Sequence, residues 1–165
     1  MISVNHLIEA ISYEFRILKH LGSKVTAENK SYRFSDVQRT TEEVEQYIIS
    51  SFPAQIKLMV LGKRDEDMYT NYTNQFASFT FDQFATSLDK ALEEISADLL
   101  TVQDEQWEET INIRWKTAAR SAFLVDYVLV FLWAYKMQLF LQLKAAGCPI
   151  DTYNLWAGID TPKQA

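Results

Sequence analysis

Apolar residues recur at helical spacing along most of this chain, and the pattern predicts four long helices. The first runs from about Val4 to Leu21 and ends at Gly22, because glycine is common just beyond a helix C-terminus. The apolar side chains that share its buried face are Leu7, Ile8, Ile11, Phe15 and Leu18. A polar connection, SKVTAENKSYRFSDVQR, follows.

The second helix begins at a capping box that is formed by Thr40 and by Glu43 three residues later. Its apolar pattern continues to Leu61. Pro53 lies well inside the pattern and cannot donate a backbone hydrogen bond, so we expect a kink or a break there. The stretch after it, GKRDEDMYTNYTNQF, is charged and polar and is interpreted as a loop.

The third helix begins at another capping box, Thr80 with Gln83, and its buried face extends to Leu99. After it, apolar and polar residues alternate briefly over Thr110 to Trp115, which indicates a short extended segment. The fourth helix is predicted from Thr117 to Ala146, ending at Gly147 with a proline two residues beyond.

The tail CPIDTYNLWAGIDTPKQA contains several large apolar side chains that would be unfavourable in water, so we expect it to fold back on the helices. Long helices joined by loops of moderate length are typical of a four-helix bundle. The sequence therefore predicts an all-α fold, a four-helix bundle with an ordered C-terminal tail, as a single domain over residues 1–165.

Composition supports this interpretation and restricts the partners. Only four Gly and three Pro leave little material for the many turns of an all-β fold. The net charge of −6, without a stripe of Lys and Arg, disfavours nucleic acid. Cys148 is the only cysteine, so no disulfide forms within the chain.

No signal peptide is visible at the N-terminus. The most apolar run, Ser121 to Tyr135, is interrupted by Asp126 and is shorter than the roughly 20 residues of a membrane span. We therefore expect a cytoplasmic protein without a membrane partner. Asp126 is either a catalytic carboxylate or a paired surface group, and Arg120 or Arg16 is the expected partner.

The fourth helix carries two distinct faces. Phe131, Tyr135, Gln138 and Gln142 share one of them, at offsets of four, seven and eleven residues. Either these amides are satisfied by hydrogen bonds with tyrosine inside the bundle, or the face lines a ligand pocket with polar groups.

The other face carries Leu129, Trp133, Met137 and Phe140. A bundle helix that is buried on one side should not be apolar all round, so either the tail or a second subunit covers this face. Aromatic residues and Met are enriched at interfaces, and two-fold dimers are the commonest oligomers. We expect a homodimer with Trp133 near the centre of its interface.

Two segments resemble the DinB/YfiT-like superfamily of bacterial four-helix-bundle proteins. HLGSKVTAENKSYRFSDVQRTTEEVEQYI is similar to the family's passage into the second helix, with an R-[ST] start at Arg39–Thr40. YKMQLFLQLKAAGCPIDTYNLW resembles the ending HRGQL…YLR..G…P..Y. The residues that fall in register with this ending are Gln138–Leu139, Leu143–Lys144, Gly147 and Tyr153. The resemblance covers nearly the whole chain and also implies a dimer.

The resemblance further implies three histidines that bind a divalent metal, often nickel or zinc. In this sequence those positions fall at Tyr47, Phe131 and Tyr135, whereas the only histidines, His6 and His20, lie in the first helix. A divalent ion needs several convergent lone pairs, and a phenylalanine supplies none. We therefore expect no metal or other cofactor. The former site is predicted to be a vestigial pocket of Tyr47, Phe131, Tyr135, Gln138 and Gln142.

Three functions follow as hypotheses. The first is a non-catalytic bundle that binds a small molecule or a partner. The second, as the wider superfamily suggests, is a metal- or thiol-dependent transferase or hydrolase, with Glu43 or Glu45 and a tyrosinate as ligands. The third is a purely structural dimeric interaction protein. A cavity lined by Tyr47, Tyr135 and Gln138 would favour the binder, and a solidly packed interior the interaction protein.

Overall fold

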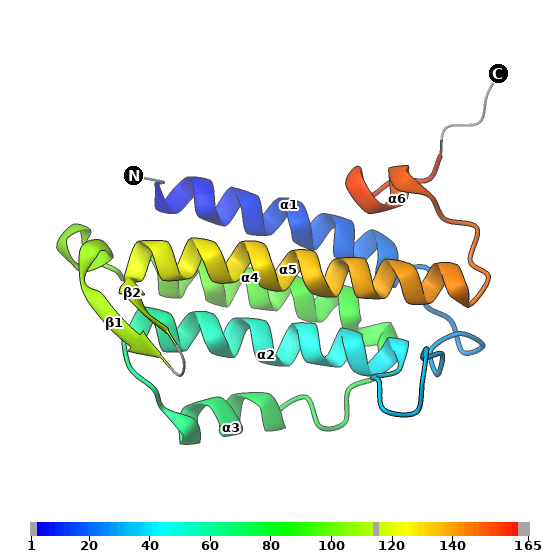
Figure 1. Ribbon diagram of the computed structural model, residues 1–165, viewed down its shortest axis with the longest axis horizontal. Coiled ribbons are helices and arrows are strands. Elements are labelled where there is room, and N and C mark those ends of the chain that lie inside the picture. Colours follow the sequence, from blue (N-terminus) through cyan, green and yellow to red (C-terminus); the bar gives the residue numbers. More distant parts are fainter. Residues whose placement is uncertain (1–2, 114–115, 162–165) are drawn as a thin grey trace.

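The computed structural model describes residues 3–113 and 116–161. Its long helices are α1 (Val4–Gly22), α2 (Thr41–Leu61), α4 (Phe84–Leu100) and α5 (Arg120–Ala145). Both α1 and α2 pack against α4 and α5, which makes a four-helix bundle (Figure 1). This confirms the predicted all-α bundle, and its hydrophobic core contains side chains from all four long helices.

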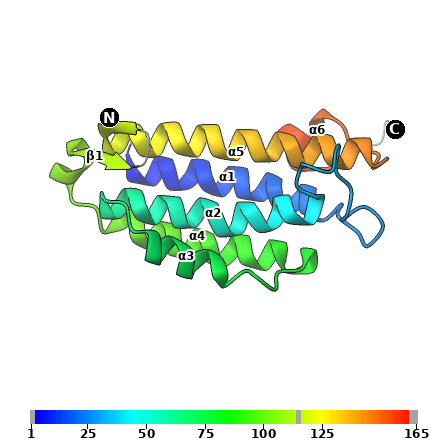
Figure 2. The same cartoon turned by 60° about the horizontal axis from the view of Figure 1, so that its bottom comes forward.

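Shorter elements cover the sides and ends of the bundle. Helix α3 runs beside α2, and α6 lies against α1 and α5 (Figures 1 and 2). These shorter elements are α3 (Glu66–Asn74), the 3-10 turns η1 (Phe81–Gln83) and η2 (Asp104–Glu108), the strands β1 (Thr110–Ile113) and β2 (Lys116–Ala119), and α6 (Thr152–Trp156).

Helix α2 begins as its sequence predicts and continues further than Pro53 suggests. Thr40 is the N-cap, its hydroxyl accepts from the Glu43 backbone N–H, and the Glu43 carboxylate accepts from the Thr40 N–H at 2.7 Å. The helix then passes through Pro53 without a break, so that alternative was wrong. Because α2 packs against α3, α4 and α5, tertiary contacts compensate for the hydrogen bond that proline cannot donate.

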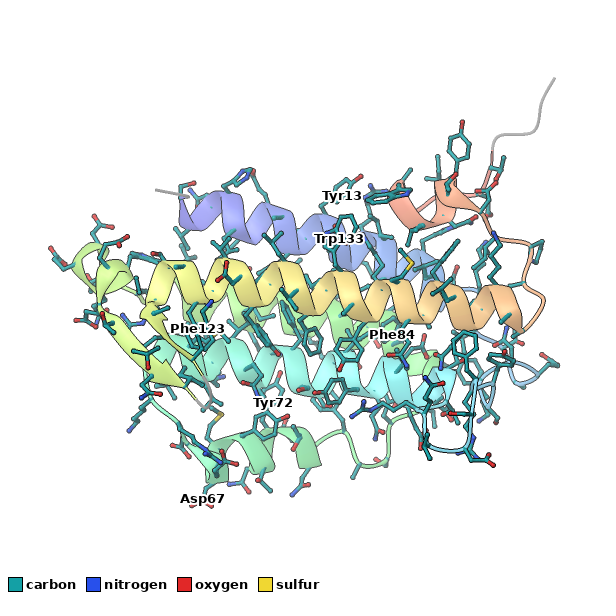
Figure 3. All side chains as sticks on the ribbon, viewed as in Figure 1. Tyr13, Asp67, Tyr72, Phe84, Phe123 and Trp133 are labelled. Carbon is teal, nitrogen blue, oxygen red and sulfur yellow. The ribbon has the colours of Figure 1, made fainter. Side chains whose placement is uncertain are left out.

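The segment that was interpreted as a loop contains α3, and this interpretation was wrong. Asp65 caps the helix, and its carboxylate accepts from the Met68 N–H at 2.9 Å. Glu66 and Asp67 in the first turn interact favourably with the positive end of the helix dipole and so stabilise the helix. Tyr72 is buried and points from α3 toward α2, and its hydroxyl donates to Glu94 of α4 (Figure 3). Met68 and Tyr69 also pack against the core, and the Tyr69 hydroxyl lies 3.0 Å from that of Ser51, so these three side chains hold α3 on the bundle.

The extended segment predicted near Thr110 is confirmed as β1, which pairs antiparallel with β2. The fourth helix was expected to start at Thr117, but Thr117 pairs with Asn112 in this hairpin, so α5 begins only at Arg120. Strand pairing satisfies the backbone groups of residues 117–119, which accounts for the later helix start. Arg114 and Trp115 lie outside the described residues.

Arg120 is buried where the hairpin meets α5. Its guanidinium donates to the Met59 carbonyl at 3.1 Å and to the Gln106 carbonyl at 2.5 Å, and it pairs with Glu109. Arg120 is therefore not the partner of Asp126, and that expectation was wrong. Asp126 is exposed and pairs with Lys116 of β2.

The tail folds back on the bundle as predicted. Leu155 of α6 is buried in the core. The Tyr13 hydroxyl donates to the Trp156 carbonyl at 2.9 Å, and Arg16 donates to the Ala157 carbonyl at 2.7 Å. Both donors belong to α1, so the tail is fixed along that helix.

Within residues 3–113 and 116–161, α5 is the one helix that is long and apolar enough to cross a membrane. Helix α5 has 26 residues and is therefore longer than the apolar run from Ser121 to Tyr135 that was compared with a membrane span. Core helices of soluble proteins pass the same test of length and composition. In this fold α5 packs against α1 and α2 and buries the charged side chain of Lys136.

Candidate functional site

The three aromatic residues at the predicted site come together between α2 and α5. The ring centroid of Tyr47 lies 5.7 Å from that of Phe131 and 4.9 Å from that of Tyr135. The centroids of Phe131 and Tyr135 are 4.5 Å apart. These distances are those of direct aromatic packing, so the three positions form one cluster, called the aromatic cluster below.

The aromatic cluster continues into the core through Phe52 and Tyr127. The Phe131 centroid lies 5.3 Å from that of Phe52 and 5.4 Å from that of Tyr127. Phe52 in turn contacts Phe15 of α1. Rings from three helices thus fill the space between α2 and α5, and the centre of the predicted pocket is packed.

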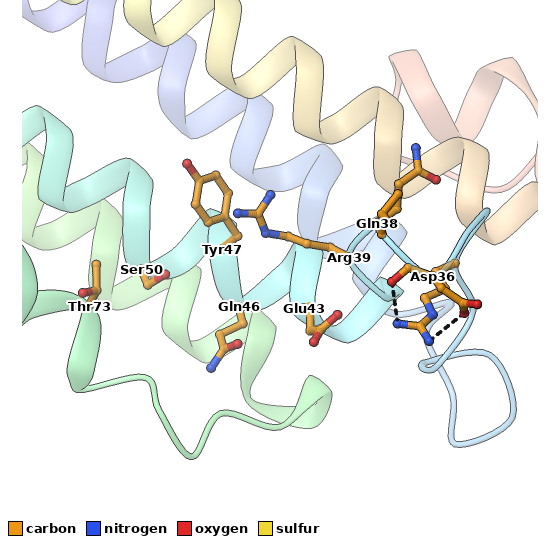
Figure 4. Close-up of a pocket in the computed structure, with 10 residues that line it drawn as sticks. Asp36, Gln38, Arg39, Glu43, Gln46, Tyr47, Ser50 and Thr73 are labelled. Carbon is orange, nitrogen blue, oxygen red and sulfur yellow. Dashed lines mark hydrogen bonds and ion pairs between the residues drawn. The ribbon is translucent and has the colours of Figure 1, made fainter. Parts of the chain in front are cut away.

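A polar cavity of about 400 Å³ opens on one side of the aromatic cluster (Figure 4). It lies between α2, the end of α3 and the loop that precedes α2, and Tyr47 forms part of its wall. The guanidinium carbon of Arg39 lies 3.9 Å from the centroid of the Tyr47 ring, within the range of a cation–π contact. Charged and polar residues that line it include Arg33, Asp36, Glu43, Gln46 and Ser50.

A second cavity, of about 360 Å³, opens on the other side of the aromatic cluster and is mainly apolar. Its wall is made by α2, α5 and the hairpin, and Tyr127, Phe131 and Tyr135 line it. The charged residues at this cavity, Lys116 and Asp126, pair with each other. The aromatic cluster therefore separates a polar cavity from an apolar one.

The two glutamines of the predicted pocket have different environments. Gln142 is fully buried, and its side-chain amide donates to the Arg39 carbonyl at 2.7 Å, not to a tyrosine. The hypothesis of Tyr–Gln hydrogen bonds was therefore wrong for Gln142. Its Oε1 has no hydrogen-bond partner among the described residues. Gln138 is half-buried and is not among the residues that line either cavity.

No protein-family model matches the sequence, and no curated protein matches it. The crystal structure of a DinB-like protein, YjoA from Bacillus subtilis, is similar to it with a TM-score of 0.64 and 17% sequence identity. The match covers 86% of this chain and 92% of that one. This chain has the DinB-like fold.

A metal of the kind that the DinB-like resemblance implies does not fit the residues at these positions. Phe131 has no donor atom. Burial, and then the neighbouring Tyr47, raise the pKa of Tyr135, which opposes its conversion to a tyrosinate ligand. Within the described ranges no group of three or more His, Cys, Asp or Glu side chains is placed to hold a metal ion.

The two glutamates that were considered as alternative ligands do not join the aromatic cluster. The Glu43 carboxylate is bound to the N-terminus of its own helix through Thr40. Glu45 is fully buried on the side of α2 that faces α1 and α4, where Gly22 and Phe84 meet it. Burial, with a smaller contribution from Glu42, raises the pKa of Glu45 to about 9, so this carboxyl is neutral at pH 7.

The stripe of α5 that was predicted to form a dimer interface is only partly at the surface of the DinB-like bundle. Leu129 and Trp133 are exposed and Met137 is half-buried. Phe140 is buried in the core, so its assignment to the interface was wrong. The tail covers part of the stripe, because the rings of Trp156 and Trp133 pack edge to face with centroids 4.9 Å apart.

Sequence reasoning missed Arg39 as a site residue. Arg39 precedes the N-cap of α2, and its side chain extends along the helix to the Tyr47 ring (Figure 4). No helical spacing relates a residue outside a helix to one two turns inside it, so periodicity gives no signal for this contact. The one available signal was the R-[ST] helix start, which identifies the position without indicating its partner.

Proposed function

We propose that this protein is a non-catalytic, small-molecule-binding member of the group of proteins with the DinB-like fold, and that it has lost the metal site. The observation that carries the proposal is the apolar cavity beside the aromatic cluster. Its volume of about 360 Å³ lies in the range of roughly 300–1,000 Å³ that is common for ligand pockets, and most of its lining is apolar. An apolar or aromatic molecule fits this lining.

The chemistry around the cavity supports binding more than catalysis. Lys116 and Asp126 neutralise each other at its rim. Phe131 and Tyr135 offer ring faces, and the raised pKa of Tyr135 keeps its hydroxyl protonated at neutral pH. Such walls favour stacking with a ligand and provide no activated nucleophile.

A fluorescent probe tests this proposal directly. The neutral dye N-phenyl-1-naphthylamine is titrated into tag-free protein, and its emission should rise as it enters the cavity. Ala134 lines the cavity on α5, so Ala134→Phe should fill it and weaken dye binding at least about tenfold, equivalent to about 1.4 kcal/mol. Ala145→Phe, the same change at an exposed position of the same helix, should bind as the wild type does.

Circular dichroism on both variants separates lost binding from lost folding. A wild-type protein that does not bind the dye, or equal binding by a folded Ala134→Phe variant, would contradict the proposed cavity function. Loss of binding in both variants would show that the dye binds a surface of α5 that lies outside the cavity, which also contradicts it.

We also propose that α5 mediates a homodimer, and a specific observation favours this second role. Leu129, Val130 and Trp133 are large apolar side chains with 53%, 70% and 41% of their surfaces exposed. They lie together on the outer face of α5, and contiguous apolar patches of this kind mark interfaces. A second copy of the chain that presents the same face would bury both patches symmetrically.

Light scattering at micromolar concentration measures this association. We expect a dimer for the wild type and a monomer for Leu129→Glu, because the new charge would be desolvated at the interface. Leu100→Glu, at an exposed leucine of α4, should remain dimeric. A monomeric wild type would rule out the dimer, and a dimeric Leu129→Glu variant would place the interface elsewhere.

A further inference from the structure

Arg39 is held at both its backbone and its side chain. The fully buried amide of Gln142 on α5 donates to the Arg39 carbonyl and fixes the backbone just before α2. At the other end, the guanidinium lies over the Tyr47 ring, 3.9 Å from its centroid. An arginine stacked on an aromatic face keeps the N–H donors at the edge of its plane accessible. The backbone and the side chain of Arg39 are therefore both preorganised.

Among the described charged residues that line the polar cavity, Arg39 is the one whose side chain makes neither a hydrogen bond nor an ion pair. Arg33 and Asp36 pair with each other at 2.9 Å. Glu43 accepts the Thr40 N–H, and this bond, more than the nearby arginines, lowers its pKa and keeps it ionised. Among the described residues, no hydrogen bond or ion pair engages the Arg39 guanidinium.

We propose that Arg39 is the anchor of an anion site in the polar cavity, and that it binds a carboxylate or phosphate group of a small-molecule ligand. This inference rests on the proposed function, and it adds the chemical class of the ligand. A guanidinium presents parallel N–H donors that match the paired oxygens of either group. Figure 4 shows the Arg39 side chain reaching across the cavity toward Tyr47, with Ser50 on the next turn of α2.

The position of the cavity fits an amphipathic ligand. Tyr47 lines the polar cavity, and Tyr135, in contact with Tyr47, lines the apolar one. A molecule with an acidic group at Arg39 and an apolar body against the Tyr47 wall of the polar cavity would contact one face of the aromatic cluster. The acidic group is the part that the Arg39 geometry specifies.

The test uses NMR titrations of the full-length, tag-free protein at constant ionic strength. The probes are benzoate, phenyl phosphate, inorganic phosphate and the neutral benzyl alcohol. We expect benzoate or phenyl phosphate to bind at least tenfold more tightly than benzyl alcohol and to shift the Arg39 side-chain resonance. Tighter binding of benzoate identifies a carboxylate site, and tighter binding of phenyl phosphate a phosphate site. Inorganic phosphate tests whether the anion alone suffices.

Three variants decide the assignment. Arg39→Gln should weaken binding of the anions at least about tenfold, because two charge-assisted hydrogen bonds are lost. Arg39→Lys keeps the charge without the planar fork and should bind with intermediate affinity. Arg64→Gln removes a surface arginine that lines neither cavity and pairs with Glu66, and it should bind the anions as the wild type does.

The outcomes separate this inference from the proposed function. Anion binding that survives Arg39→Gln, or that Arg64→Gln weakens equally, would overturn the Arg39 site. Equal binding of benzyl alcohol and benzoate would do the same. If N-phenyl-1-naphthylamine binding still responds to Ala134→Phe in that case, the apolar cavity retains its function. Anion binding that depends on Arg39 in a protein that does not bind the dye would support this site and contradict the proposed apolar one.

Discussion

Lys136 of α5 and Glu14 of α1 form an ion pair inside the bundle, with Nζ and Oε2 2.5 Å apart and only 2% and 17% of the two side chains exposed. The same ammonium group lies 5.0 Å from the centroid of the Trp133 ring and 5.5 Å from that of Trp156. One buried cation thus joins α1, α5 and α6. A charge in this position is stable only while its partner remains.

Removal of the lysine alone should be costly. Lys136→Met leaves the Glu14 carboxylate without its partner, and we expect the free energy of unfolding to fall by about 2–3 kcal/mol, somewhat below the range for fully buried pairs because Glu14 keeps some contact with water. The double variant Lys136→Met/Glu14→Leu should recover most of this loss. Urea denaturation of the single and double variants measures both effects, and an additive double variant would show that the two residues are not coupled.

Glu45 should make stability depend on pH. Its pKa is about 9 in the folded protein and near 4.3 when unfolded, so the folded state holds the proton more tightly. Its contribution is fully present below about pH 4.3 and is lost progressively as pH rises through 9. The slope approaches about 1.4 kcal/mol per pH unit between these values.

The variant Glu45→Gln replaces the neutral acid with a neutral amide of similar shape and should flatten that dependence between pH 5 and 9. Denaturation at several pH values measures it. Glu42→Gln, at a partly exposed neighbour on the same helix, is the matched control and should keep most of the wild-type slope. A wild-type stability curve that is already flat over this range would contradict a buried neutral carboxyl.

Gly22 should not tolerate a side chain. A Cβ at this position would lie 2.4 Å from Cδ1 of Phe84 and 3.0 Å from Oε1 of Glu45. Gly22→Ala should therefore lower the free energy of unfolding by about 1–3 kcal/mol through overpacking, although alanine favours a helix. Gly147→Ala is the informative control, because its cost comes from a positive φ with no atom within 4 Å. Thermal denaturation compares the two, and an unchanged or raised Tm for Gly22→Ala would show that Phe84 moves aside.

The contact between Trp133 and Trp156 should be visible in spectroscopy. Two indole rings with centroids 4.9 Å apart couple their transitions, so the wild type should show an exciton couplet in circular dichroism. Trp156→Ala should abolish it and lower stability by about 1 kcal/mol, as expected for an aromatic pair at the surface. Trp107→Phe, far from this pair in the hairpin region, should keep the couplet. Its persistence in Trp156→Ala would mean that another pair produces it.

Much of the fold was predictable because its signals are local. Thr40 with Glu43 marks the start of α2, whereas Thr80 with Gln83 marks the 3-10 turn η1 that leads into α4 at Phe84. The recurrence of apolar residues indicates the buried faces. The start of α5 was not predictable in this way, because Thr117 pairs with Asn112 in a hairpin. That pairing competes with a helical pattern which, read alone, extends further toward the N-terminus.

The candidate site was predicted in part. The convergence of Tyr47, Phe131 and Tyr135 followed from the resemblance and is confirmed by their ring contacts. The role of Gln142 was not predictable, because its partner is a backbone carbonyl 103 residues earlier in the chain. The burial of Glu45 was predictable from its spacing. Glu45 lies three residues before Ile48 and four before Ile49, both of which are in the core, so it falls on the apolar face of α2.

Arg120 couples the opening of separate segments at one end of the bundle. Its guanidinium is shared by the Met59 carbonyl in the last turn of α2 and by η2, and the absence of a side chain at Gly62 leaves room for it, since a Cβ there would lie 2.6 Å from Nη2. When the start of α5 lifts away, these acceptors lose the same donor at once. Backbone amides of β1 and of the end of α2 should therefore exchange hydrogen for deuterium with one common opening free energy. This end of the molecule should unfold locally as one cooperative unit.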